Sequence, residues 1–153
     1  MFDYLPLAAT IDDSVFCVHA GLSPSLQNIS DIIEIKRIKE IPHEGPFADL
    51  MWSDPDDSPS ASGFKYSNRG AGYMFGGDVV ERFLHTNNCI RIYRAHQLCT
   101  EGFQEFFDGK LATVWSAPNY CYRFGNLASV LELDEKLNGY FNVFEDSPDN
   151  RLD

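Results

Sequence analysis

Two histidines, His19 and His96, follow apolar runs at the points where strands give way to loops. His19 comes directly after residues 15–18, and His96 follows residues 90–93 after two intervening residues. Neutral imidazole is the commonest protein ligand for transition metals, so this pair could hold a metal ion. Alternatively, each ring only forms hydrogen bonds within a half-buried loop. Both interpretations stay open on these residues alone.

A divalent ion in a hydrolytic site also requires oxygen ligands from carboxylate or amide side chains. The acidic cluster closest to these requirements consists of Asp54, Asp56 and Asp57. Pro55 and Pro59 interrupt this segment, so we interpret it as a solvated turn and not as a set of ligands. The two histidines therefore have no clear oxygen partners in the sequence.

Arg69 is the strongest candidate for binding a phosphate group. It lies in SNRGAGY, where Gly70 and Gly72 leave space for the planar guanidinium to face a phosphate. The alternative is an ordinary surface arginine in a flexible loop. Arg94 and Arg123 are rival phosphate binders with less favourable surroundings.

Tyr120, in the segment SAPNYC, could donate its hydroxyl to a phosphate oxygen or could simply cover an apolar edge. Its neighbour Cys121 does not indicate a cysteine phosphatase, because Leu127 stands where the C-x5-R loop requires arginine. A serine hydrolase has no support either, since the chain contains no G-x-S-x-G motif. We interpret His43 and His85 as structural residues.

Length and charge restrict the classes of partner. The chain has 153 residues, the size of one domain, and a net charge of −11, which disfavours nucleic acid and anionic membrane surfaces. No apolar run approaches the roughly 20 residues of a membrane-spanning helix. Four cysteines without a C-x-x-C pair suit a reducing intracellular compartment, cytoplasmic or nuclear.

The pattern of apolar residues and turns predicts an α/β (α+β) chain. Ser30 is expected to cap one helix and Asp78 another, whereas residues 53–63 and the glycine-rich residues 68–77 read as irregular. If the strand ends share one edge of a sheet, His19, His96 and Tyr120 converge there. The expected strands are residues 7–11, 15–18, 90–93, 103–107, 111–115, 127–133 and 140–144, and the helices are residues 31–38 and 78 to about 87.

Seven motifs occur in one order with fitting gaps: FDYLPL, VHAGLSP, IPHEGP, WSDPDD, RGAGYMFG, RAHQ and SAPNYCYRFGN. In this series the chain resembles the C-terminal half of the metal-dependent serine/threonine protein phosphatases. The type 2A-like branch, which includes phosphatases 4 and 6, is the most similar. The resemblance extends from residue 2 to about residue 144.

This resemblance implies a four-layer metallophosphoesterase fold with a central two-sheet β-sandwich flanked by helices. It implies that His19 and His96 bind one of two divalent ions, which could be manganese, iron or zinc. Arg69 would bind the substrate phosphate and Tyr120 would line the same pocket. The implied reaction is hydrolysis of phosphoserine or phosphothreonine in proteins by a metal-activated water, with regulatory or scaffold subunits as partners.

The motifs G-D-x-H-G, G-D-x-V-D-R-G and G-N-H-E of that family are absent from this sequence. Residues 1–153 are therefore expected to form the C-terminal portion of one catalytic domain, with a frayed tail at residues 146–153. We expect the chain alone to be inactive and to self-associate through exposed apolar surface and unpaired strand edges. The alternative is a non-catalytic or degenerate phosphatase-like binding module.

Overall fold

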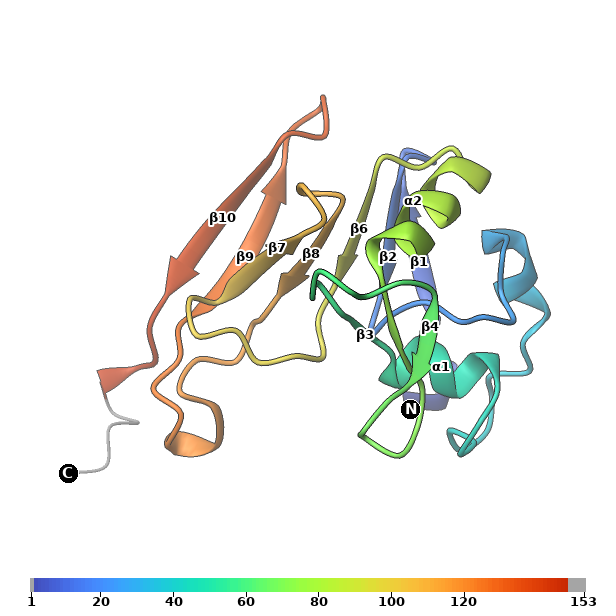
Figure 1. The fold of residues 1–153 in the computed structure, drawn as a ribbon. Helices are drawn as coiled ribbons and strands as arrows, with labels where there is room; N and C mark the ends of the chain where they lie inside the picture. The colour runs from blue at the N-terminus through green and yellow to red at the C-terminus, as the bar shows by residue number, and fades with distance from the viewer. Residues whose placement is uncertain (1, 149–153) are drawn as a thin grey trace.

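The structure is a computed structural model that describes residues 2–148, and a mixed five-stranded sheet forms its centre (Figure 1). The strand order is β1-β2-β6-β8-β7. Strands β2, β6 and β8 run parallel, whereas β1 and β7 pair antiparallel at the two edges. The strands are β1 (Ala8–Ile11), β2 (Val15–Val18), β6 (Arg91–Arg94), β8 (Leu111–Val114) and β7 (Phe103–Phe106).

The parallel strands are buried on both faces, which explains why they read as short continuous apolar runs. Their register places Phe16, Ile92 and Leu111 side by side on one face. Val15 and Tyr93 belong to a second cluster on the opposite face. Because successive side chains of a strand alternate between faces, this register sends each apolar set into a separate core.

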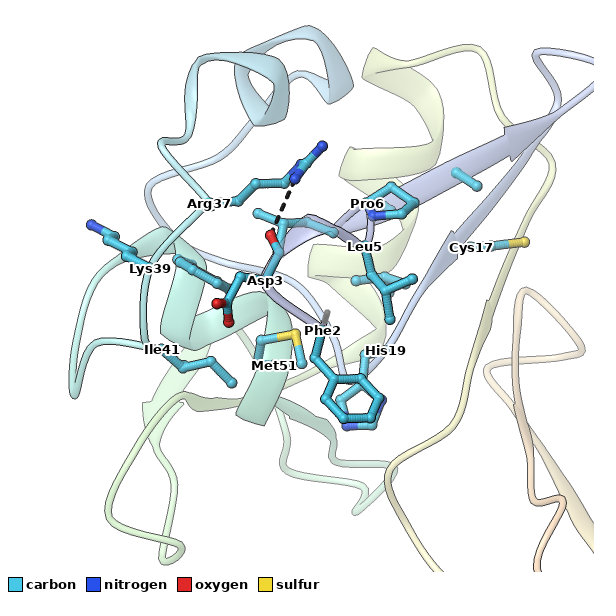
Figure 2. Close-up of a pocket in the computed structure, with 15 residues that line it drawn as sticks. Phe2, Asp3, Leu5, Pro6, Cys17, His19, Arg37, Lys39, Ile41 and Met51 are labelled. Carbon is cyan, nitrogen blue, oxygen red and sulfur yellow. Dashed lines mark hydrogen bonds between the residues drawn. The ribbon is translucent and has the colours of Figure 1, made fainter.

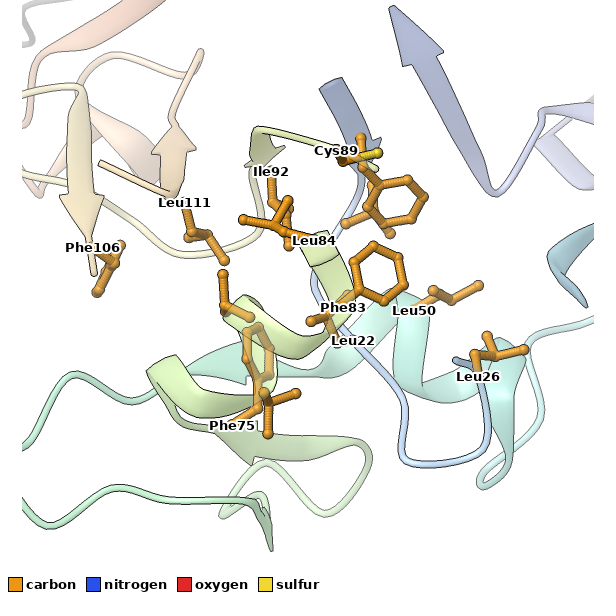
Figure 3. Packing of buried hydrophobic residues seen from close by; sticks show 14 residues of the cluster. Leu22, Leu26, Leu50, Phe75, Phe83, Leu84, Cys89, Ile92, Phe106 and Leu111 are labelled. Atoms are coloured by element: carbon orange, nitrogen blue, oxygen red, sulfur yellow. The ribbon is translucent and has the colours of Figure 1, made fainter. Parts of the chain in front are cut away.

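The larger core lies between the central sheet and helix α2 (Gly77–Thr86) (Figure 3). The rings of Phe16 and Phe83 lie 5.0 Å apart at its centre. Phe75 is fully buried in the same core and packs close to the backbone of Gly21. Helix α2 contributes Val79, Val80, Phe83 and Leu84.

A separate hairpin, β9 (Ala128–Leu133) and β10 (Gly139–Phe144), covers the opposite face of the central sheet. Its Leu131 and Phe141 pack against Val15 and Tyr93. The rings of Phe103 and Phe141 are stacked with centroids 4.0 Å apart. The predicted α/β class, with two sheets packed together and helices on the outer face, is confirmed.

A third sheet has the order β3-β5-β4 and comprises β3 (Asp54–Pro55), β5 (Tyr73–Phe75) and β4 (Phe64–Tyr66). Residues 53–63 and 68–77 are not entirely irregular, so that prediction is wrong. These strands contain only two or three residues, which is too short for the alternation that identifies a strand.

The predicted helix over residues 31–38 is also wrong. The structure has a 3-10 helix, η2 (Ile29–Glu34), which begins after Asn28 instead of Ser30. Ile33 and Ile38 are exposed, and none of the residues of η2 is fully buried. Ile29, Ile32 and Ile35 are only partly buried against the larger core, so the segment has little of the packing that stabilises most helices in proteins.

Two other helix boundaries differ from the predictions. The apolar residues 47–52 form α1 (Pro46–Trp52), which begins with proline at its first turn. Gly76 precedes α2, so Asp78 is not its N-cap; its carboxylate instead accepts a 3.0 Å hydrogen bond from the backbone of Gly63. No helix within residues 2–148 is long and apolar enough to cross a membrane.

Two further 3-10 helices are η1 (Phe2–Tyr4) and η3 (Tyr120–Tyr122). Asn119 Nδ2 donates a 3.3 Å hydrogen bond to Asp146 Oδ2, so the start of the segment expected to fray contacts the rest of the protein. Residues 149–153 of that segment lie outside the described residues.

Candidate metal centre and phosphate site

His19 and His96 meet beyond the C-terminal ends of the neighbouring parallel strands β2 and β6. His19 Nε2 lies 3.1 Å from His96 Nδ1, and the ring centroids are 5.0 Å apart. The backbone N–H of Ala95 donates a 2.9 Å hydrogen bond to the carbonyl of His19. The backbone therefore joins the two loops and sets the spacing of the two rings.

The geometry of this histidine pair fits a shared metal ion. With metal–nitrogen bonds of about 2.0–2.1 Å, adjacent ligand atoms lie roughly 3 Å apart. His96 Nε2 is buried and has no hydrogen-bond partner among the described residues. A buried polar atom without a partner is unusual and points to a ligand or water on that side of the ring, whereas an ion shared with His19 would lie at Nδ1. His19 is exposed, so the pair is accessible from solvent.

The backbone of His96 is strained, because its φ of 65° lies in the left-handed region that residues other than glycine rarely adopt. Such conformations cost about 1–3 kcal/mol and cluster at functional sites. The edge of the His96 ring also meets Trp52, with centroids 5.4 Å apart and planes at 89°. The ring orientation is thus fixed by its surroundings.

The surroundings keep both imidazoles neutral. Burial lowers the pKa of His96 to about 4, although Asp54 acts in the opposite direction. Partial burial also lowers the pKa of His19, with a further contribution from the charge of Arg94. Each neutral ring has one nitrogen with a lone pair available for a metal, whereas a protonated ring has none.

We expect the free energy of unfolding to fall by about 1 kcal/mol between pH 7 and pH 5 through His96, after allowance for partial solvent access. His96 has an ordinary pKa in the unfolded chain and a pKa of about 4 in the folded protein. The unfolded state therefore binds the proton first, and stability is lost as the pH falls below about 6.5. Urea unfolding at pH 5, 6 and 7 measures this slope. A His96→Gln variant should lose this dependence of stability on pH. An unchanged slope in the variant would show that His96 is not its cause.

Asp54 connects the histidine pair to the candidate phosphate binder. Its Oδ2 accepts a 2.6 Å hydrogen bond from Arg69 Nε, and its Oδ1 accepts one of 2.7 Å from Arg94 Nη2. The Arg69 side chain is 38% exposed, and neither of its Nη atoms has a partner within residues 2–148. Asp54 thus orients the Arg69 guanidinium while leaving its outer nitrogen atoms available to a phosphate.

Two interpretations from the sequence are overturned here. Asp54 is buried and paired, so it does not belong to a solvated turn, whereas Asp56 does accept turn-type hydrogen bonds from Ser58. Arg94 is not a phosphate binder, because its side chain is fully buried. The sequence analysis missed the pairing of these two residues; the one available signal was the position of Asp54 just after the apolar residues of α1.

Arg94 instead holds together the loops that support the site. It donates to the carbonyl oxygens of Ala20 and Ser53 and, at 2.7 Å, to Gln97 Oε1. Burial lowers its pKa to about 10, and Asp54 counteracts part of that effect, so Arg94 stays charged at neutral pH. This buried cation fixes the segments that follow β2, α1 and β6.

The small residues after His19 allow these segments to approach closely. Ala20 is fully buried. A Cβ on Gly21 would lie 2.4 Å from Phe75 Cε1 and 2.7 Å from the carbonyl oxygen of Ser53. The loop can therefore turn away from the His19 ring only because position 21 has no side chain.

Tyr120 is less clearly part of the cluster. It is 43% exposed, lies edge-on to Trp115 at 5.0 Å, and its N–H donates a 2.8 Å hydrogen bond to Asn126 Oδ1. Among residues 2–148, no hydrogen bond or ring contact joins Tyr120 to His19, His96 or Arg69. Arg123 lies over the ring of Phe124, with 5.1 Å between Cζ and the centroid.

The described residues supply only part of a metal site. Within residues 2–148, no group of three or more histidine, cysteine, aspartate or glutamate side chains is arranged to hold a metal ion. The charges of Arg69, Arg94 and Asp54 all act on His96, which places them within electrostatic reach of that ring. The structure thus brings together two nitrogen donors and a partly free arginine.

A mainly apolar pocket of about 490 Å³ opens beside His19 (Figure 2). Leu5 and Met51 belong to its walls, and Phe2 at its mouth is 80% exposed. Edge strand β1 forms one side of this pocket. A pocket of this size, with large apolar side chains exposed around it, is typical of a surface that another polypeptide covers.

A family model described as calcineurin-like phosphoesterase matches residues 1–99. The chain therefore belongs to the calcineurin-like phosphoesterase family.

Among curated proteins, the chain is 59% identical over 161 residues to the serine/threonine-protein phosphatase PP2A-like PPG1 of Saccharomyces cerevisiae, covering 99% of this chain and 44% of that protein. It is 54% identical over 145 residues to the serine/threonine-protein phosphatase 4 catalytic subunit of Kluyveromyces lactis, covering 95% and 46%. The resemblance to type 2A-like phosphatases is thus confirmed. The chain spans about half the length of these relatives.

A solved structure gives the same result for the fold. The chain matches a protein serine/threonine phosphatase from Saccharomyces cerevisiae, described as similar to human phosphatase PP5, with a TM-score of 0.84 and 35% sequence identity. The match covers 99% of this chain and 52% of that one. The described sheets and helices therefore correspond to about half of the solved phosphatase.

Proposed function

We propose that this chain forms the C-terminal half of a protein serine/threonine phosphatase catalytic domain, which hydrolyses phosphoserine and phosphothreonine. The observation that carries this proposal is the 3.1 Å separation of His19 Nε2 and His96 Nδ1, two nitrogen atoms that can face one ion. Two strands that pair in parallel deliver these nitrogen atoms from distant parts of the chain.

In this proposal, His19 and His96 hold one of two divalent ions, for which manganese, iron and zinc are all suitable imidazole-binding metals. Such a two-metal centre activates a water molecule and neutralises charge on the phosphoryl group. The free Nη atoms of Arg69 bind the phosphoryl oxygens, and Tyr120 lines the same pocket. Since the chain carries a net charge of −11, local positive charge is needed to attract a phosphorylated substrate.

The oxygen ligands come from the half of the relatives that has no counterpart in this chain. The pocket beside β1 is the surface on which that half docks, because His19 lies in its wall and apolar side chains surround it. Docking there would bring new side chains directly to the histidine pair.

The experiment is to co-express this chain with the portion of the Saccharomyces cerevisiae PP2A-like relative that it does not cover. We expect the assembly to bind about two equivalents of manganese, by elemental analysis, and to hydrolyse a phosphothreonine peptide. The chain alone should do neither. Turnover by the chain alone would contradict the proposal, and a metal-loaded assembly without turnover would favour the alternative, a phosphatase-like binding module.

We expect the isolated chain to self-associate, because Phe2 and Leu5 stay exposed and β1 has an unpaired edge. Sedimentation velocity over a range of concentrations should show species larger than a monomer. A Phe2→Asp/Leu5→Asp variant should shift the chain toward monomer, whereas an Ile90→Asp variant, altered at an exposed apolar residue outside the pocket, should not. A monomer at all concentrations would contradict this expectation.

The proposed partners are phosphoprotein substrates and regulatory or scaffold subunits. The Kluyveromyces lactis relative is a catalytic subunit by name, which supports the second class. Cys17, Cys89, Cys99 and Cys121 are all unpaired thiols in the described structure. Free thiols suit a reducing compartment, so we propose an intracellular location, cytoplasmic or nuclear.

A further inference from the structure

Trp52, the last residue of α1, lies against the ring of His96. The two ring centroids are 5.4 Å apart and the ring planes stand at 89°, which is one of the arrangements that aromatic pairs prefer. The residue is 37% exposed, so it does not belong to the hydrophobic core. The position of this large side chain is therefore explained by its neighbour and not by core packing.

No hydrogen bond at Nε2 orients the His96 ring within this chain. In most metal sites a histidine ligand donates its second ring N–H to a carboxylate, a carbonyl or water, and that bond sets the direction of the ring. His96 Nε2 is buried and has no such partner among residues 2–148. The ring contacts that remain in this part of the chain are with His19, which is exposed, and with Trp52.

The main chain at Trp52 is held by contacts on several sides. A Cβ on Gly72 would lie 2.8 Å from the carbonyl carbon of Trp52 and 2.8 Å from the backbone nitrogen of Ser53, so the β4–β5 loop packs directly on this turn. Ser53 is fully buried, and its Oγ accepts a 3.0 Å hydrogen bond from the N–H of Tyr73. Its carbonyl oxygen accepts one of 3.1 Å from Arg94 Nη2. The Trp52 side chain therefore projects from a fixed point.

The strained backbone of His96 makes such a support necessary. With a φ of 65°, His96 keeps its conformation only if the surrounding structure holds it there. The hydrogen bond from the N–H of Ala95 to the carbonyl of His19 restrains the main chain just before it. Contact with Trp52 supplies the matching restraint on the side chain.

We propose that Trp52 is a positioning residue for the metal centre, whose indole holds the His96 ring with Nδ1 turned toward His19 Nε2. The link to metal binding rests on the function proposed above, whereas the alignment of the two rings is a property of the chain itself. Without the indole, the His96 ring would be free to turn about its Cβ–Cγ bond, and Nδ1 would no longer face the shared ion. Metal affinity would therefore fall, whereas contacts of Arg69 with the phosphate would persist.

The first test requires neither metal nor activity. In NMR spectra of the purified chain at pH 7, nuclear Overhauser contacts should join the ring protons of His96 to those of His19 and of Trp52. Trp52→Leu, which keeps an apolar side chain but no ring, should lose the contact between the two imidazoles, and Trp52→Phe should retain it. Tyr140→Leu, at an exposed aromatic residue of β10, is the control and should retain it too.

Two results of this test would overturn the proposal. One is an undiminished contact between the imidazoles in Trp52→Leu. The other is the absence of any contact between His96 and Trp52 in the unchanged chain, which can be read even if the leucine variant does not fold.

A second test uses the assembly with the complementary half. Trp52→Leu should lower manganese affinity by about tenfold or more, the usual loss for a group that orients a metal ligand, and Trp52→Phe should restore most of it. At saturating manganese, kcat should recover and KM for a phosphothreonine peptide should stay nearly unchanged. A residue needed only for folding would instead lower kcat at every manganese concentration, and that result would contradict the positioning role.

The two tests separate this role from the phosphatase function. If the assembly shows no turnover, the ring contacts in the isolated chain still decide whether Trp52 positions His96. If the assembly is active and Trp52→Leu binds manganese as tightly as the unchanged protein, the role of Trp52 in metal binding is wrong although the phosphatase function stands.

Discussion

Replacing Arg94 with methionine is expected to lower the free energy of unfolding by about 3–5 kcal/mol. The Arg94 side chain is fully buried and pairs with Asp54, which is buried as well. Methionine would leave that carboxylate with Arg69 as its remaining cation, and the carbonyl oxygens of Ala20 and Ser53 would lose their donor. Domains of this size have total stabilities of about 5–15 kcal/mol, so a large share would be lost.

Urea unfolding followed by circular dichroism measures this change. Arg123→Met is the matched control, because Arg123 is exposed and contacts the Phe124 ring; its effect should be below about 1 kcal/mol. The double variant Arg94→Met/Asp54→Leu removes both buried charges and should recover part of the lost stability. A stability of Arg94→Met within 1 kcal/mol of the unchanged chain would show that the ion pair is not needed to hold these loops.

Replacing His96 with alanine in the two-part assembly is expected to lower manganese affinity by more than about 100-fold and to abolish measurable hydrolysis. Groups that only orient metal ligands already contribute about 10–100-fold, so a ligand itself should contribute more. The structure provides two nitrogen donors that lie 3.1 Å apart, and without His96 only the donor of His19 would remain. Manganese titration with activity as the readout measures this loss.

His85→Ala is the control, since His85 is exposed on α2. The fold of the His96→Ala chain should be checked separately, and its stability at pH 5 should not fall below that of the unchanged chain. Deleting this half-buried neutral ring removes a group that resists protonation in the folded state. Full metal affinity in His96→Ala would rule out the role proposed for this residue.

The sequence alone predicts those strands and turns that are marked by the residues within them. Residues 15–18 and 90–93 carry the apolar runs of buried strands, and β2 and β6 form there as expected. The hairpin of β7 and β8 is also correctly predicted, because the turn at Asp108 and Gly109 separates two apolar segments. The meeting of the two histidines follows from these strands being parallel neighbours.

The sequence cannot reveal pairings that depend on tertiary contacts. Asp54 looks like part of a polar loop, yet two arginines from different segments make its burial possible. The predicted helix over residues 31–38 has suitable spacing of isoleucines, but Ile32 and Ile35 are only partly buried against the core, and only the short η2 forms. In both cases the deciding partners lie far away along the chain.

The hydrogen bond between Ala95 and the carbonyl of His19 has one more consequence. In many metalloproteins, gathering the ligands costs conformational entropy that is subtracted from the binding energy of the ion. Here the main chain already holds the two nitrogen donors in register before any ion arrives. The metal affinity of the assembled protein should therefore depend chiefly on how well the docked half places its oxygen donors. Metal occupancy would then be controlled mainly through that half.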